Sequence, residues 1–180
     1  MAPQTATKLT YEDFLLLPDD GRRHEIIDGE HYVNPSPLTR HQMVSMRLVL
    51  AVANFVYEHG LGHVFHPPYD VVLGEHDIVE PDLIFVSDDR SHIITRANIQ
   101  GTPDLLVEIL SPSKPEYDTR LKYKTYERHG VPEYWIVDPD AGSISVFRHD
   151  GTSFVRAESS DPLTSPLLPG FFLPLAPLFA

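Results

Sequence analysis

The chain contains no cysteine, and this absence removes several classes of protein from consideration. Disulfide-stabilised folds, zinc–thiolate sites and enzymes with a thiol nucleophile all require that residue. No apolar run reaches the roughly 18–20 residues that a membrane-spanning helix needs. The segment from Met1 to Lys8 also lacks the apolar core of a signal peptide. The sequence therefore predicts a protein without a membrane segment and with a cytoplasmic location.

Basic residues are also scarce. The chain has 14 Lys and Arg against 26 Asp and Glu, which gives a formal net charge of −12 at pH 7. Proteins that bind duplex DNA over a broad surface present many basic side chains to its phosphates. This composition argues against tight binding to bulk duplex DNA. Any nucleic-acid site must be local, and the basic residues do gather in two stretches, residues 22–47 and 120–128.

A length of 180 residues fits one domain. We expect a loose leader over residues 1–9 and a single domain over residues 10–180. Asp28 and Gly29 separate two short β-favouring runs, and this dipeptide is typical of a tight hairpin turn.

Helical periodicity is clearest between residues 38 and 58. The apolar residues that recur at helical spacing there predict its buried face: Met43, Met46, Leu50, Ala53 and Val56. A second amphipathic pattern predicts a helix over residues 116–129. Helices that alternate with apolar β-type runs indicate an α/β (α+β) fold.

Two carboxylates interrupt apolar runs that are typical of buried strands. Asp82 lies within residues 79–86 and Glu108 within residues 104–110. A carboxylate in a buried strand costs several kcal/mol unless it is paired or binds a metal. Strand pairing, at about 4.8 Å between strands, would bring the two side by side. Asp104 shares a strand face with Glu108 but lies about 13 Å away along it, so we expect Asp104 to be a strand-start residue.

A lysine on the predicted second helix completes the set. Asp118, Lys122 and Tyr126 are spaced i, i+4 and i+8, on one helical face. The helix follows the Glu108 strand after a short connection, so the Lys122 ammonium can reach back toward the carboxylates. There it would orient an attacking water or stabilise charge on a phosphate. Two carboxylates and a lysine are the minimum set for metal-assisted phosphodiester cleavage. The alternative is that Asp118 and Lys122 form only a surface ion pair.

The segments that contain these residues resemble the Uma family of bacterial restriction endonucleases, part of the PD-(D/E)XK nuclease superfamily. The resemblance covers residues 10–179. The matching segments are His24–Glu30, Pro35–Pro37 with His41, Pro81–Leu83, Val107–Ser113, Asp118–Tyr126, Gly130–Asp138 and Leu167–Phe171. It implies a restriction-endonuclease-like core, in which a central mixed sheet is flanked by helices.

The resemblance also implies a function. It implies an endonuclease that hydrolyses phosphodiester bonds of DNA with Mg²⁺ or Mn²⁺, with Asp82 and Glu108 as metal ligands. Lys122 and Glu25 would be further catalytic residues. The superfamily carries its lysine two residues after the glutamate, where this chain has Leu110, so the lysine would be displaced to Lys122. The alternative is a non-catalytic interaction protein that retains the nuclease scaffold.

Three assignments stay open at this stage. Glu25 could instead pair with Arg22 or Arg23. His41 is a candidate base, a phosphate contact or a polar residue at the start of a helix. The tail over residues 162–180, rich in Leu, Phe and Pro, either closes its own core or contacts a second copy in a homodimer.

Overall fold

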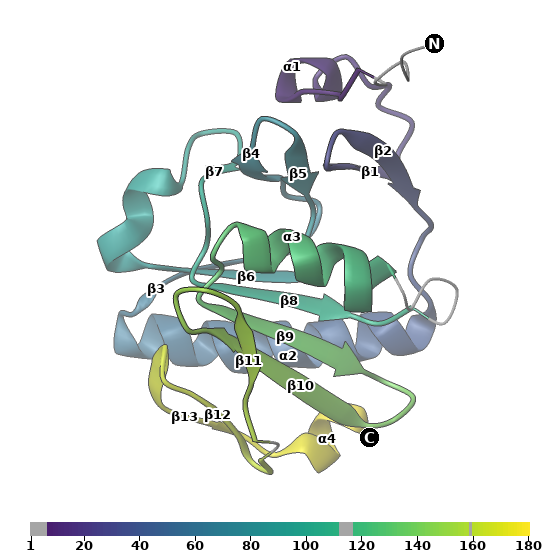
Figure 1. Cartoon of the computed structure of the whole chain (residues 1–180). Helices are drawn as coiled ribbons and strands as arrows, with labels where there is room; N and C mark the ends of the chain where they lie inside the picture. Colours follow the sequence, from purple (N-terminus) through teal and green to yellow (C-terminus); the bar gives the residue numbers. More distant parts are fainter. Residues whose placement is uncertain (1–6, 112–116, 159) are drawn as a thin grey trace.

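A computed structural model of the chain describes residues 7–111, 117–158 and 160–180, apart from the side chain of Asp118. Two β-sheets and their helices make up most of the structure (Figure 1). Most of the predicted leader, residues 1–6, lies outside the described residues, as does the connection over residues 112–116 that follows the Glu108 strand.

The larger sheet has six strands in the order β11-β10-β9-β8-β6-β3. Their bounds are β3 (Gly62–Phe65), β6 (Leu83–Ser87), β8 (Leu105–Ile109), β9 (Glu133–Asp138), β10 (Ser143–His149) and β11 (Phe154–Arg156). β8 and β9 are parallel, whereas the other neighbours are antiparallel. Helices lie on both faces of this sheet (Figure 1). The prediction of a mixed sheet flanked by helices is therefore confirmed.

The smaller sheet has five strands in the order β2-β1-β5-β4-β7. Their bounds are β1 (Arg23–Ile27), β2 (Glu30–Asn34), β4 (Val71–Gly74), β5 (Asp77–Val79) and β7 (Ile99–Gln100). Asp28 and Gly29 both have positive φ angles, 53° and 80°. That combination matches the right-handed twist of a two-residue hairpin. The predicted hairpin is confirmed, and its β1 strand carries Arg23 and Glu25.

The prediction of one strand over residues 79–86 is wrong. β5 ends at Val79 and β6 begins at Leu83, and the two strands belong to different sheets. Pro81 has no backbone N–H to donate to a strand ladder, so the chain leaves one sheet at this point and enters the other. Asp82 consequently lies in the connection between the two sheets, directly before β6.

The long helix is confirmed as α2 (Thr39–His59), and Gly60 ends it in the left-handed conformation, at φ 59°. Its predicted buried face is confirmed at Val56 and wrong at most of the other predicted positions. The larger predicted members are about half exposed: Met43, Met46 and Leu50. The buried residues of α2 are His41, Val44, Leu48, Val52 and Val56, and the four apolar ones pack in the cluster that includes the larger sheet. The helix carries two apolar stripes, and the one that contains Val44, Leu48 and Val52 packs into the core.

The opposite face of the larger sheet packs against a helix that begins with a π-helical segment, η2 (Tyr117–Lys122), and continues as α3 (Tyr123–Arg128). The predicted second helix is confirmed from residue 117, but its first turn is π rather than α. The short helix α1 (Tyr11–Phe14) has no buried residue, whereas η1 (Asp88–Ile93) contributes Ile93 to this core. Among the helices of the described ranges, none combines the length and apolarity that crossing a bilayer requires.

The C-terminal residues form a hairpin and a short helix: β12 (Leu163–Ser165), β13 (Leu168–Leu173) and α4 (Leu175–Phe179). Their buried side chains join the same apolar cluster as α2: Leu163, Leu168, Phe171 and Leu178. The tail therefore closes its own core, as one of the two alternatives expected. The homodimer stays a prediction.

Candidate active site

Strand pairing brings the two predicted carboxylates together. β6 and β8 are antiparallel with Leu83 opposite Val107, so Asp82 and Glu108 are the next residues in register. The Ile109 N–H donates to Asp82 Oδ2 at 2.9 Å, which fixes the aspartate against β8. Both carboxylates border one small cavity of about 40 Å³, and both are almost fully buried.

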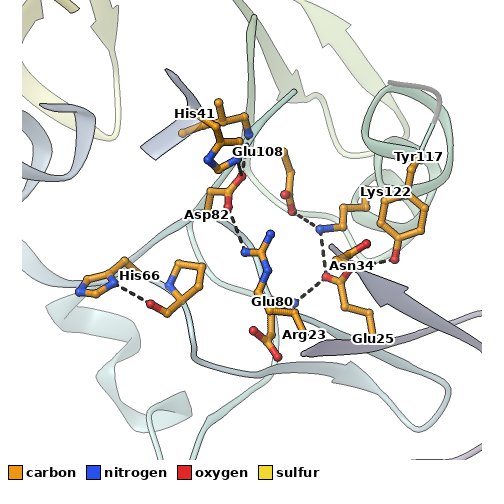
Figure 2. Close-up of polar contacts among 12 residues, drawn as sticks. Arg23, Glu25, Asn34, His41, His66, Glu80, Asp82, Glu108, Tyr117 and Lys122 are labelled. Carbon is orange, nitrogen blue, oxygen red and sulfur yellow. Dashed lines mark hydrogen bonds and ion pairs between the residues drawn. The ribbon is translucent and has the colours of Figure 1, made fainter. Parts of the chain in front are cut away.

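Lys122 lies between two buried carboxylates (Figure 2). Its Nζ is 2.9 Å from Glu108 Oε1 and 2.9 Å from Glu25 Oε1, and its side chain is 2 % exposed. The Tyr126 hydroxyl donates to the same Glu108 oxygen at 2.6 Å. The alternative of a surface ion pair is wrong for Lys122, while the side chain of Asp118 lies outside the described residues.

Glu25 reaches this cluster from β1 and is fully buried. Besides Lys122, it accepts hydrogen bonds from the Glu80 N–H at 2.7 Å, from the Tyr117 hydroxyl at 2.8 Å and from Asn34 Nδ2. Burial alone would raise the pKa of Glu25, but the Lys122 charge and these hydrogen bonds lower it below its usual value. The glutamate is therefore ionised at neutral pH and holds the ammonium in place.

The two arginines have other partners than Glu25, so that alternative pairing is wrong. Arg22 lies 3.7 Å from Asp20, whereas Arg23 Nη1 lies 3.1 Å from Asp82 Oδ1. His41, in the first turn of α2, bonds the other oxygen of Asp82 through Nε2 at 3.1 Å. Figure 2 shows Asp82 held from two sides by Arg23 and His41.

The same contacts set the charge of Asp82. Burial would raise the pKa of its carboxyl, but the hydrogen bond from His41 and the charges of His41 and Arg23 lower it to about 2. Asp82 is therefore an anion across the whole physiological pH range.

This pKa predicts an acid-dependent loss of stability. Because the pKa of Asp82 falls from 3.8 to about 2 on folding, its stabilisation is present above pH 3.8 and is lost as the pH falls through about 2. The shift corresponds to about 2 kcal/mol of unfolding free energy. Urea unfolding between pH 5 and pH 2 should show a shallower acid-dependent loss in Asp82→Asn than in the wild type. The exposed control Glu75→Gln should follow the wild type, and equal slopes for wild type and Asp82→Asn would contradict the assignment.

Two residues near Glu108 on the chain lie outside the cluster. Asp104 accepts the Ser87 N–H at 2.8 Å and pairs with Arg90 at 3.2 Å, so it is a strand-start residue as expected. Leu110 packs into the apolar cluster on the α3 side of the sheet. The lysine that contacts Glu108 is Lys122, on the following helix.

The next question is whether the side chains of this cluster could bind Mg²⁺ or Mn²⁺. In the described ranges, no group of three or more His, Asp or Glu side chains is arranged to hold a metal ion. Asp82 Oδ2 already accepts two hydrogen bonds, from Ile109 and His41, and Oδ1 faces Arg23. Carboxylate oxygens are nevertheless the ligands that these hard cations prefer. The carboxylates of Asp82 and Glu108 fit such an ion, provided that the Arg23 guanidinium moves away from Asp82 Oδ1.

A larger groove of about 890 Å³ leads to this cavity. The β1–β2 hairpin, one side of α2 and residues 66–68 form its walls. Arg23, His41 and Asp82 border both the groove and the small cavity. A ligand in the groove would therefore approach the carboxylates past these three side chains.

Comparison with known proteins now identifies the family. The model of the Uma2 family, described as "Putative restriction endonuclease", matches residues 11–176. The chain belongs to the Uma2 family. The resemblance found in the sequence is thereby confirmed. The matched residues include Asp82, Glu108 and Lys122.

Two further proteins are similar to this Uma2 chain. The uncharacterized protein slr1290 of Synechocystis is 25% identical over 143 residues, which covers 78% of this chain and 74% of that protein. A crystal structure described as a putative nuclease belonging to DUF820 from Anabaena variabilis has a TM-score of 0.77 and 22% identity. It covers 95% of this chain and 97% of that one. This similarity confirms the fold.

Sequence reasoning missed three members of the cluster: Arg23 as the partner of Asp82, Asn34 and Tyr117. Arg23 precedes Glu25 by two residues in a strand, so both side chains share one face, and this signal was available. Tyr117 and Lys122 are five residues apart, a spacing that a π-helical turn brings to one face but an α-helix does not.

Proposed function

We propose that this protein is a metal-dependent endonuclease that hydrolyses phosphodiester bonds of DNA. Asp82 and Glu108 would hold Mg²⁺ or Mn²⁺. When bound, that ion would supply a Lewis acid for the phosphate and lower the pKa of a water molecule. The groove beside the carboxylates would admit the nucleic acid, which matches a local site on a chain of net charge −12.

Lys122 has two tasks in this proposal. Its ammonium orients the attacking water toward phosphorus and stabilises the negative charge that grows on the phosphate oxygens as the P–O ester bond breaks. Glu25 is a positioning residue, because it holds the ammonium through the 2.9 Å contact and keeps it charged in a buried environment.

One observation carries the proposal. A lysine that is 2 % exposed bridges two buried carboxylates, one of which shares a cavity with a third carboxylate, Asp82. Burying four charged groups is costly, and a core needs none of them to fold. An arrangement with this cost, at the end of a groove, is typical of a catalytic site.

Cleavage of supercoiled plasmid and of single-stranded DNA tests the proposal. With Mg²⁺ or Mn²⁺ the wild-type protein should nick or linearise the plasmid, EDTA should stop cleavage, and added metal should restore it. A preparation that cleaves equally well in EDTA would contradict metal dependence.

A non-catalytic protein that retains the nuclease scaffold is the second candidate. The observation that favours it is that both oxygens of Asp82 already have partners: Arg23, His41 and a backbone N–H. Under this alternative neither DNA is cleaved with either metal, and the charged network serves only the fold.

A further inference from the structure

Arg23 stands at the boundary between the groove and the carboxylate cavity. It borders both spaces, and its side chain is 24% exposed. Figure 2 shows its guanidinium pointing from β1 toward Asp82. This inference rests on the proposed function, because it concerns how the same site would take up metal and substrate.

Arg23 contacts the Asp82 oxygen that has no other partner among the described residues. Asp82 Oδ2 accepts hydrogen bonds from the Ile109 N–H and from His41, which fills its two lone pairs. Oδ1 receives Arg23 Nη1 at 3.1 Å. A magnesium–oxygen bond is about 2.1 Å long, so an ion on the same oxygen would lie within about 5 Å of the arginine nitrogen. Two cations at this separation repel each other strongly in a buried site.

The Arg23 guanidinium can also donate a further hydrogen bond. Its Nε is buried and has no hydrogen-bond partner among the described residues. A guanidinium presents paired N–H donors in a plane, the geometry that matches two oxygens of a phosphate. A phosphate that enters through the groove meets Arg23 before it reaches Glu108, because Arg23 borders the groove and Glu108 borders only the inner cavity.

We propose that Arg23 exchanges its carboxylate partner, Asp82, for a phosphate group of the nucleic acid. In the free protein Arg23 neutralises Asp82 and weakens metal binding. When a phosphate takes the guanidinium, Asp82 Oδ1 becomes available to the metal. Phosphate and metal therefore bind cooperatively, and by thermodynamic linkage each tightens the binding of the other by the same factor.

Calorimetric titration with Mn²⁺ alone tests whether Arg23 weakens metal binding in the free protein. Arg23→Met removes the competing cation and should bind Mn²⁺ about tenfold more tightly than the wild type. The control is Arg22→Met, because Arg22 borders the groove but not the inner cavity, and its Mn²⁺ affinity should equal that of the wild type. Equal or weaker Mn²⁺ binding by folded Arg23→Met overturns the proposal.

Thymidine 3′,5′-bisphosphate tests the second half, because it offers phosphates without a phosphodiester bond to cleave. The measured Mn²⁺ affinity is corrected for the Mn²⁺ that the nucleotide itself binds. Saturating nucleotide should then raise the affinity of the wild type for Mn²⁺ at least fivefold and leave that of Arg23→Met unchanged. Arg23→Lys keeps the positive charge but loses the paired N–H donors of the guanidinium. The coupling between nucleotide and Mn²⁺ binding should therefore be smaller than in the wild type. If thermal melting shows that Arg23→Met does not fold, Arg23→Lys decides, and undiminished coupling there overturns the proposal.

The two proposals fail in different ways. If Mn²⁺ binds the wild type and Arg23→Met alike, the exchange is wrong and the metal site stands. If Mn²⁺ binds neither protein, with or without nucleotide, both the exchange and the metal-dependent function are wrong.

Discussion

Replacing Lys122 by methionine is expected to lower the free energy of unfolding by about 3–5 kcal/mol, because the change leaves buried carboxylates without their counter-ion. Glu25 and Glu108 each lie 2.9 Å from the ammonium, and neither side chain is more than 3% exposed. The same variant should lose all measurable DNA cleavage. Chemical unfolding at pH 7 and plasmid cleavage measure the two effects on one preparation.

Two comparisons separate charge from packing in this experiment. Lys124→Met changes an exposed lysine two residues away and should leave stability and cleavage close to wild type. In Lys122→Met combined with Glu25→Gln, one unpaired charge is removed, so part of the lost stability should return while cleavage stays absent. A loss below about 1 kcal/mol in Lys122→Met would show that the buried network does not depend on this ammonium.

Glu108→Gln is expected to reduce cleavage by at least about 10³-fold while the fold is retained. The amide can still accept the Tyr126 hydroxyl through its oxygen, but it removes the charge that would hold the metal and pair with Lys122. Initial rates of plasmid nicking measure the loss, and circular dichroism monitors the fold.

Glu133→Gln is the matched control. Glu133 is a buried glutamate on the neighbouring strand β9, where it accepts Trp135 Nε1 and Arg148 Nε at 2.7 Å each, away from the cluster. Its cleavage rate per folded molecule should equal that of the wild type. Full activity in Glu108→Gln would remove this glutamate from the chemistry.

The apolar runs around Asp82 and Glu108 could be predicted from the sequence, because period-two alternation is a local rule. Glu108 interrupts an apolar strand, and pairing of β6 with β8 placed Asp82 beside it. The reach of Lys122 followed from the short distance along the chain between strand and helix. Only the contact between Lys122 and Glu108 joins elements that lie close along the chain; the adjacency of Asp82 and Glu108 required the assumption that their strands pair.

Other features depended on tertiary contacts. The sheet covers the α2 stripe that contains Val44 and Leu48, whereas the stripe with Met46 and Leu50 is exposed, and periodicity alone ranks both as apolar faces. Tyr117 joins the cluster only because the helix begins with a π-turn. The pairing of Arg23 with Asp82 joins residues 59 positions apart. Strand alternation places Arg23 on the face of Glu25, but it does not identify Asp82 as the partner.

A metal titration tests the central claim of a metal-dependent site most directly. Calorimetry with Mn²⁺, in the presence of thymidine 3′,5′-bisphosphate, should give saturable binding to the wild type. The control Asp104→Asn changes a buried aspartate bound to Ser87 and Arg90 and should bind equally well. Asp82→Asn should bind at least about tenfold more weakly, since a neutral amide is a poorer ligand for a hard cation. Unchanged Mn²⁺ affinity in Asp82→Asn would contradict the account.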